Sequence, residues 1–401
     1  MGFAFIAVAS IAQTQPLATR GKEFWLGFMQ NAYGAQALKL NIAAINATSG
    51  TVSMPGTGWS TPFSVGSNGL TTVTVPNTAE HTGSESVSNK AVVIQALDSV
   101  TVAAESYQSF TSDAAQVLPI NSLGISYRAE GYRGLPGFAE FYKSELLIVA
   151  TQDGTQVIIT PSVNTSGGHS AGTPFTVSLN AGQTYQVQGA LASLDITGTS
   201  VVATAQSGPC RPFAVFSGSM CANVPVGCQA CDHIFEQMVP TDRWGTNFHT
   251  ILFNGVTSST YRVVADQAGT QVMVNGALVA TLNAGQSFQA NGTTAPVCIT
   301  TSAPVSAAQL MEGFNCAGNG DPSMIELVPD ERRSTSAIFS TMPSPQVNSH
   351  AVSVVMPTAN IAQLTLDGVN VSGALFQPYA GCAGWSTAKI PVTAGQHRLA
   401  A

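Results

Sequence analysis

The stretch Pro240-Thr-Asp-Arg-Trp-Gly-Thr-Asn-Phe248 has the form Pro-x4-Gly-x2-aromatic, and this form recurs along the chain. PINSLGISY occupies 119–127, and PLATRGKEF occupies 16–24. A degraded copy starts at Pro329, where Ser334 stands in the glycine position and Phe339 comes two positions late. A segment that recurs at long and nearly regular intervals indicates tandem structural units.

Each copy opens a unit that continues in the same order, with two recurring turns. Gly-Thr-Gln-Val occurs at 154–157 and 269–272, and Ala-Gly-Gln occurs at 181–183, 284–286 and 394–396. Units on the order of 100 residues have the size of whole sandwich domains, each with its own core, and exceed the size of solenoid repeats. The sequence therefore predicts an all-β chain of about four tandem β-sandwich-like repeat units, the last truncated. The expected bounds are 16–118, 119–239, 240–328 and 329–401.

The composition is that of a β-rich chain with few charges. Only 9% of residues are charged, 44% are apolar and 38 are glycine, whereas roughly a quarter of an ordinary globular chain is charged. The net charge is -7, and Lys and Arg form no cluster. Nucleic-acid binding depends on a basic footprint, so no nucleic acid is expected as a partner.

Period-two alternation in the first unit, and further short runs separated by Gly, Asn, Asp or Pro, predict strands at intervals of about ten residues. The clearest are expected at 39–43, 70–75, 91–96, 146–151, 156–160, 175–179, 184–188, 261–265, 271–274, 277–282, 352–356 and 363–366. One short helix is expected at 231–239, because Asp232 is placed to cap it and Pro240 to end it.

The N-terminus is an apolar run with small residues at its end, which predicts the remnant of a secretory signal peptide at 1–15. The alternative is a buried first strand. The run is shorter than the roughly 20 residues that span a bilayer, so no membrane span is expected in this fragment. The chain ends before the closing strands expected of its fourth unit, which predicts that it is part of a longer, secreted or surface-displayed protein.

Seven cysteines agree with an oxidising compartment and structural disulfides. Four crowd together in the second unit, and their pairing is left open: Cys210, Cys221, Cys228 and Cys231. Cys298 and Cys316 stand 18 residues apart, which is compatible with adjacent strands, so they are the expected bridge. Cys382 is left over, either free or paired with a residue beyond Ala401.

Three stretches resemble the N-terminal domain family of IgG Fc-binding protein, which also occurs in bacterial surface and secreted proteins. They are GKEFWLGF at 21–28, VFSGSMCANVP at 215–225 leading into CDHIFEQMVP at 231–240, and the weaker GNGDPSM at 318–324. Together they cover nearly all of the chain after residue 15. The resemblance implies a non-enzymatic role in adhesion or display. Fc binding has no short motif that can be assigned to residues here.

Cys228-Gln-Ala-Cys231, followed by Asp232-His233, presents soft donors that could hold zinc or exchange thiols. A zinc site needs four ligands, and no second Cys/His pair stands at finger-like spacing. A redox motif normally belongs to a βαβ unit, which the strand pattern does not show. Disulfides are therefore expected here, with no metal and no cofactor.

No catalytic residue is assigned. Ser217 lacks the Gly-x-Ser-x-Gly frame of a nucleophile elbow, and the six histidines are scattered. The carboxylates that could serve glycoside cleavage are Glu140, Glu145, Glu236, Glu326, Asp330 and Glu331. Glu236 and Glu326 both come shortly before a unit-opening proline, which predicts a repeated structural hydrogen bond.

Trp59 and Trp385 are the candidate ligand-binding residues, because both follow glycine-rich stretches at comparable places in the first and fourth units. The alternative is that each closes the end of a sandwich. The expected function is a secreted or cell-surface, non-enzymatic adhesion module that binds glycoprotein, mucin or glycan. The alternatives are a structural spacer or stalk of a larger surface protein and a cryptic carbohydrate-active enzyme.

Overall fold

The computed structural model describes residues 16–135, 141–204, 211–341, 349–379 and 381–401. Within these ranges it contains thirty β-strands, the short helix α1(Phe314–Ala317) and six single-turn or slightly longer 3-10 helices. The predicted all-β fold is confirmed. The described residues contain no helix with the length and apolarity needed to cross a membrane. The predicted signal-peptide remnant at 1–15, Glu140 and Cys210 lie outside the described residues.

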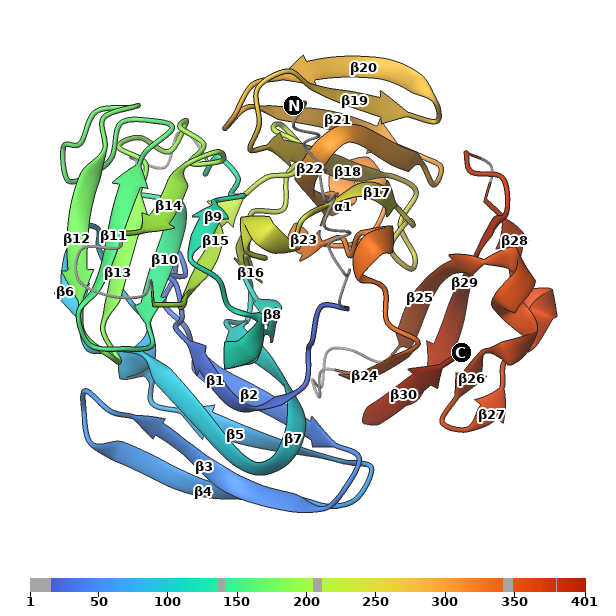
Figure 1. The fold of residues 1–401 in the computed structure, drawn as a ribbon, viewed down its shortest axis with the longest axis horizontal. Helices are drawn as coiled ribbons and strands as arrows, with labels where there is room; N and C mark the ends of the chain where they lie inside the picture. The colour runs from blue at the N-terminus through green and yellow to red at the C-terminus, as the bar shows by residue number, and fades with distance from the viewer. Residues whose placement is uncertain (1–15, 136–140, 205–210, 342–348, 380) are drawn as a thin grey trace, which may run out of the picture.

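The first group of strands is one seven-stranded antiparallel sheet (blue to teal in Figure 1), and it is organised around a long strand, β7. Its members are β1(Gly21–Leu26), β2(Ala37–Ala44), β3(Thr48–Met54), β4(Trp59–Val65), β5(Gly69–Val75), β7(Val92–Tyr107) and β8(Asp113–Val117). The first half of β7 pairs with β1 and β3, and its second half pairs with β2 and β8. β7 therefore runs from one layer of a sandwich into the other, and β4 and β5 end the two layers.

The third group has the same pairing order around β22. Its members are β17(Gly245–His249), β18(Ser259–Ala265), β19(Thr270–Val274), β20(Ala277–Leu282), β21(Ser287–Thr293), β22(Cys298–Met311) and β23(Ser323–Glu326). The first half of β22 pairs with β17 and β19, and its second half pairs with β18 and β23.

In the second group the equivalent of the long strand is split in two, so the layers are separate sheets. One layer has the order β12-β11-β14-β9 and the other β16-β15-β10-β13-β6. The bounds are β6(Val87–Ser88), β9(Ser126–Arg128), β10(Ser144–Ala150), β11(Thr155–Thr160), β12(Phe175–Leu179), β13(Thr184–Gln188), β14(Ser200–Ala203), β15(Phe213–Ala222) and β16(Asp232–Gln237). Three groups thus share one pairing order, while the division into four units with the expected bounds stays a prediction.

The fourth group forms two small sheets, β24-β30-β26-β27 and β25-β29-β28. Its strands are β24(Ser336–Ser340), β25(His350–Pro357), β26(Thr365–Leu366), β27(Val369–Asn370), β28(Gln377–Pro378), β29(Trp385–Val392) and β30(Gln396–Ala400). The Ala-Gly-Gln turns at 181–183 and 284–286 join β12 to β13 and β20 to β21. The third copy joins β29 to β30, one connection later, so its assumed equivalence is wrong. All three glycines have positive φ, a requirement that any tight hairpin can impose.

The expectation that each unit buries its own core is wrong for the first two. The first core continues from Phe24 and Ile94 into Leu147 and Phe216 of the second group. The second core in turn includes Leu310 of the third group. Strands β10, β13, β15 and β16 are therefore buried along their whole length.

The helix expected at 231–239 is strand β16 instead. Its successive apolar residues point to opposite sides, since Ile234 lies in the second core and Phe235 in the first. A strand buried on both faces shows no polar alternation, and its apolar run can be mistaken for that of a short helix.

The recurring Pro-x4-Gly motif joins one group to the next. A Cβ placed on Gly21, Gly124 or Gly245 would overlap the Cβ of Pro119, Pro240 or Pro329, respectively. Each glycine thus packs against the proline that opens the following unit. Each of these prolines precedes a 3-10 turn: η2(Ile120–Ser122), η3(Thr241–Arg243) or η4(Asp330–Arg332). The glycine is needed for close approach, because even one methyl group has no room there.

Candidate functional site

The most promising ligand surface is a groove of about 530 Å³ between the edge strands β4 and β5, called here the β4–β5 groove. Neither strand pairs with the other, so the first sheet stays open at this place. The lining residues are Trp59, Ser60, Thr61, Pro62, Phe63, Ser64, Thr71, Thr72, Val73 and Thr74. The volume lies within the roughly 300–1,000 Å³ range of ligand pockets.

Period-two alternation determines what this groove presents. Phe63 is buried in the first core, whereas Ser60, Ser64, Thr72 and Thr74 are exposed. Each hydroxyl both donates and accepts hydrogen bonds, and no charged side chain lines the groove. The surface therefore suits a neutral polar ligand such as a sugar.

Trp59 begins β4 at one end of the groove, and its ring is half-buried against the first core. The ring of Trp59 therefore packs on the core, as a residue that closes a sandwich does, and also lines the groove, as a ligand-binding residue does. The threonines and serines of the groove were not singled out from the sequence. Their signal was the alternation in LTTVTV at 70–75, which was used only to predict a strand.

Trp385 lies elsewhere, at the junction of the third and fourth groups, and the structure does not bring it near Trp59. Its ring centroid is 3.9 Å from that of His249, and the Arg333 guanidinium lies 4.6 Å from the Trp385 ring centroid. His249 Nε2 lies 3.1 Å from an Asp330 carboxylate oxygen. The indole is therefore already held by two neighbours of its own chain.

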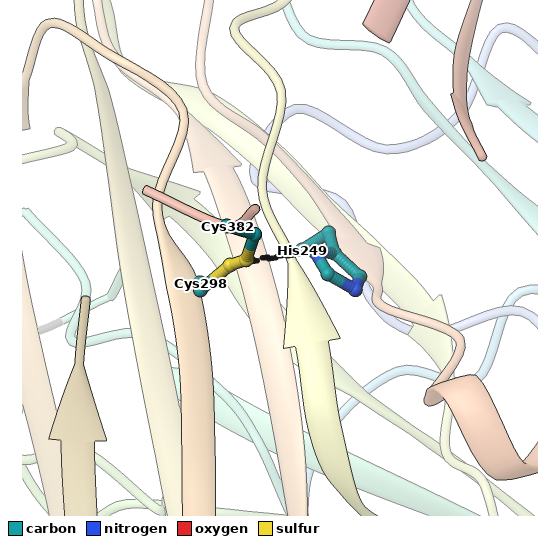
Figure 2. Close-up of side chains that lie close together, drawn as sticks. All are labelled: His249, Cys298 and Cys382. Carbon is teal, nitrogen blue, oxygen red and sulfur yellow. Dashed lines mark hydrogen bonds between the residues drawn. A yellow bond between two sulfur atoms is a disulfide. The ribbon is translucent and has the colours of Figure 1, made fainter. Parts of the chain in front are cut away.

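His249 also faces a disulfide between Cys298 and Cys382, as Figure 2 shows. His249 Nδ1 lies 3.5 Å from Cys382 Sγ and 3.7 Å from Cys298 Sγ. Tyr379 strengthens this junction, since its hydroxyl lies 2.7 Å from the carbonyl oxygen of Val297.

The other disulfides are Cys221–Cys231 and Cys228–Cys316. The predicted bridge between Cys298 and Cys316 is therefore wrong. Cys298 begins β22 and Cys316 lies in α1 beyond its far end. A straight strand of that length spans on the order of 40 Å. The expected adjacent strands are one long strand, and Cys382, expected to be left over, pairs with Cys298.

Cys228 and Cys231 belong to different bridges, so the C-x2-C stretch closes no loop of its own. Cys221–Cys231 joins the end of β15 to the start of β16. Cys228–Cys316 joins the second group to the third, as Cys298–Cys382 joins the third to the fourth. His233, next in sequence, is fully buried, and its Nδ1 lies 2.9 Å from the carbonyl oxygen of Ser219.

Six carboxyl groups with raised pKa lie at the contacts between groups and are called here the buried acids. They are Asp113, Glu130, Glu145, Asp232, Glu236 and Glu326. Burial raises the pKa of Asp113 and Asp232 to about 8 and that of Glu130 to about 7. Burial has the opposite effect on two histidines, His81 and His233, whose pKa falls to about 4.

Ser306 shows why a proton stays in this region. Its hydroxyl oxygen lies 2.8 Å from a Glu130 carboxyl oxygen and 3.0 Å from a Glu326 carboxyl oxygen. One hydroxyl proton can satisfy only one of the two contacts, so the other requires a proton on a carboxyl group. Glu326 thus makes a structural hydrogen bond, while the repetition of that bond at Glu236 stays a prediction.

Glu236 and Glu326 line a central cavity of about 110 Å³ together with Trp244 and Phe248. This volume is well below the range of ligand pockets and fits a few water molecules. Asp330 and Glu331 are engaged with His249 and Thr246, respectively.

A wider groove of about 1080 Å³ separates the segment 16–20 from the fourth group. Arg20, Arg332 and Arg333 contribute to its lining. Arg332 donates to the carbonyl oxygens of Arg243 and Asp242, and Arg333 stacks on Trp385. Two of the three cations are therefore committed to contacts within the chain.

Comparison with known proteins gives one family and one curated relative. A family model described as IgGFc binding protein matches residues 113–401. IgGFc-binding protein of Homo sapiens is 29% identical over 238 residues, which are 57% of this chain and 4% of the human protein. The chain thus spans a small fraction of the relative's length.

Two solved structures show only faint likeness. An α-L-rhamnosidase of Streptomyces avermitilis, complexed with L-rhamnose, has a TM-score of 0.17 at 10% identity, covering 82% of this chain and 44% of its own. A Ca2+-stabilized adhesin with which an Antarctic bacterium binds ice has a TM-score of 0.14 at 12% identity, covering 92% and 90%. Likeness at this level carries no argument about fold or function.

Proposed function

Because the chain belongs to the IgGFc-binding protein family, we propose that it is a secreted or cell-surface module that binds glycoprotein or glycan without catalysing a reaction. Membership of a binding family supports the general role. The three disulfides support an extracellular location, since disulfides persist in oxidising compartments. The β4–β5 groove is the observation that supports a sugar ligand.

The chemistry of the groove matches a neutral sugar in two respects. The exposed hydroxyls of Ser60, Ser64 and Thr74 can donate to and accept from sugar hydroxyls, and that of Thr72, which donates to Asn41 Oδ1, can accept. Trp59 offers an apolar ring at one end, against which the C–H face of a sugar ring can pack. The strands beneath the groove are fixed by the first core, so little conformational entropy is lost on binding.

Trp385 is the weaker of the two tryptophan candidates. His249 and Arg333 already contact its ring, and a ligand would have to displace one of them. We therefore assign ligand binding first to Trp59 and treat Trp385 as part of the junction between the third and fourth groups.

The test is a glycan and glycoprotein array, including mucin and immunoglobulin, probed with the oxidised chain. We expect saturable binding that falls at least tenfold in W59A. F110A is the matched control, because Phe110 is an aromatic residue that is 86% exposed and lies outside the groove. Equal binding by W59A and the unchanged chain would remove the groove from the proposal.

A structural spacer is the second candidate function, and the joined cores favour it. Two disulfides and continuous apolar packing link successive groups, which makes the chain stiff. A blank array with folded, oxidised protein would favour the spacer. In that case W59A and W385A should both leave surface display of the parent protein unchanged.

A further inference from the structure

The cluster of His249, Cys298 and Cys382 places three metal-ligating atoms within 4.8 Å of one another (Figure 2). The residues come from three different segments: His249 ends β17, Cys298 begins β22, and Cys382 precedes β29. Their meeting therefore depends on the packing of the fourth group on the third, and no local sequence motif encodes it.

Asp330 fixes the orientation of the histidine ring. Its carboxylate lies 3.1 Å from His249 Nε2, and a carboxylate only accepts hydrogen bonds, so Nε2 carries the ring proton. In the neutral ring, Nδ1 then presents a lone pair toward the two sulfurs. Neither sulfur of a disulfide can donate to it, and the side chain is only 9% exposed. A carboxylate behind a histidine whose free nitrogen faces thiol sulfurs is the usual arrangement around bound zinc.

The distances fit zinc coordination. Tetrahedral Zn2+ with Zn–S of about 2.3 Å and Zn–N of about 2.05 Å places nitrogen and sulfur about 3.6 Å apart. The observed separations from His249 Nδ1 are 3.5 Å to Cys382 Sγ and 3.7 Å to Cys298 Sγ. Only the two sulfurs must separate, from bonding distance to about 3.8 Å.

We propose that reduction of the Cys298–Cys382 disulfide converts this cluster into a Zn2+ site. The ligands are the two cysteine sulfurs and His249 Nδ1, Asp330 is the positioning residue behind the histidine, and water takes the fourth position. A phosphine reductant donates two electrons and breaks the S–S bond. The phosphine takes an oxygen atom from water and becomes the phosphine oxide, and the two protons of that water pass to the two sulfurs. Zinc then binds both thiolates and releases those two protons.

The site would let the junction exchange one crosslink for another. The disulfide and the zinc–thiolate cluster use the same sulfurs, so only one can exist at a time. Either one ties the third group to the fourth. Loss of both leaves only non-covalent contacts between the two groups, among them the hydrogen bonds of Tyr379 and Lys389 to the carbonyl oxygens of Val297 and Phe253.

The experiment begins with stepwise phosphine reduction of the full chain, with alkylation and mass spectrometry to follow the Cys298–Cys382 pair. Zinc bound per chain is then measured, and Co2+ is substituted to detect thiolate charge-transfer absorption. We expect one zinc per chain, at least tenfold weaker binding in H249A, and about 10–100-fold weaker binding in D330N. The C221S/C231S variant is the control and should bind zinc as the unchanged chain does.

A second variant needs no reductant and so avoids loss of the other disulfides. C298H cannot form the bridge but keeps three ligands around the same position. It should bind one zinc in oxidising buffer, and C298H/H249A should not. The proposal is overturned if zinc affinity is the same with and without His249 in both backgrounds, or if the C221S/C231S variant alone loses the metal.

Discussion

Gly124→Ala tests whether the recurring glycine exists to admit the next unit's proline. An added Cβ would overlap the Cβ of Pro240 and lie 3.0 Å from its Cγ. Carbon atoms pack best at about 3.5–4.0 Å, so the proline ring and its 3-10 turn must move by roughly 1 Å. Both partners are tied to backbone, and no flexible side-chain end can yield instead.

The expected cost follows from two opposing effects. Overpacking of this kind destabilises by about 1–3 kcal/mol. Replacing glycine by alanine also restricts the unfolded chain, which stabilises by about 0.4–1 kcal/mol where the backbone conformation is compatible. G66A is the matched control, because a Cβ on Gly66 meets nothing within 4 Å and its φ is not in the left-handed region. The difference between the two variants isolates the overpacking cost.

Calorimetric unfolding of both variants is the measurement. G124A should melt roughly 2–12 °C below G66A, at about 2–4 °C per kcal/mol. In a P240G background, the same Gly124→Ala change should lower the melting temperature less than it does in the parent chain, because the proline that the new Cβ meets is gone. The reasoning is refuted if G124A and G66A melt together, or if removing the proline leaves the cost of the alanine unchanged.

Two further predictions concern the contacts between groups. C298S/C382S opens a loop of 84 residues in sequence separation, and chain entropy predicts a loss of about 4–5 kcal/mol, measurable by urea unfolding of the oxidised protein. The pKa of each of the buried acids is raised by folding, so their contribution to stability is greatest at low pH and is lost as pH rises toward 8. The two buried histidines lower the stability as the pH falls below about 6.5. The six buried acids outnumber them, so the melting temperature should rise as the pH is lowered from 8.5 to 5. The free energy of unfolding should change by up to about 1.4 kcal/mol per pH unit for each net proton taken up on folding, and E130Q should reduce this change. A stability that falls as the pH is lowered would contradict the assignment.

Most strands were predictable from the sequence. The candidate groove lies where one face of the strands is polar, whereas β10, predicted at 146–151, is buried along its whole length. LTTVTV alternates between polar and apolar residues from Thr72 onward, and β5 has nearly the predicted bounds. The stretch around Phe235 was predicted wrongly because it is buried between two cores, so no polar face marks its period, and because Asp232 and Pro240 stand where a helix would begin and end. The cysteine pairing failed for a related reason. A strand as long as β22 shows no break in sequence at which one layer ends and the next begins.

The cluster around His249 could not have been predicted, because its members meet only when the fourth group docks on the third. His249, Asp330 and Cys382 are far apart in sequence, and no local spacing links a histidine, a carboxylate and a cysteine at these positions. The Pro-x4-Gly repeat can be found in the sequence, but the contact that explains it cannot. The proline of one copy contacts the glycine of the copy before it, and a single copy contains only half of each contact.

The second group shows what can occupy the edge that lines the β4–β5 groove. β13 holds the position in the second group that β5 holds in the first, and its edge pairs with β6, whose residues precede all the other strands of the second group in the sequence. The corresponding edge of β5 has no strand partner among the described residues. An extended polypeptide could add there as β6 does, so a glycoprotein could be held by its sugar or by its backbone.

Enzymatic removal of sugars from a bound glycoprotein distinguishes binding through the sugar from binding through the backbone. Because the groove is rich in hydroxyls and ends at Trp59, we expect binding to be lost with the sugars. Retained binding would instead identify the β5 edge as a site of strand addition and would leave W59A without effect.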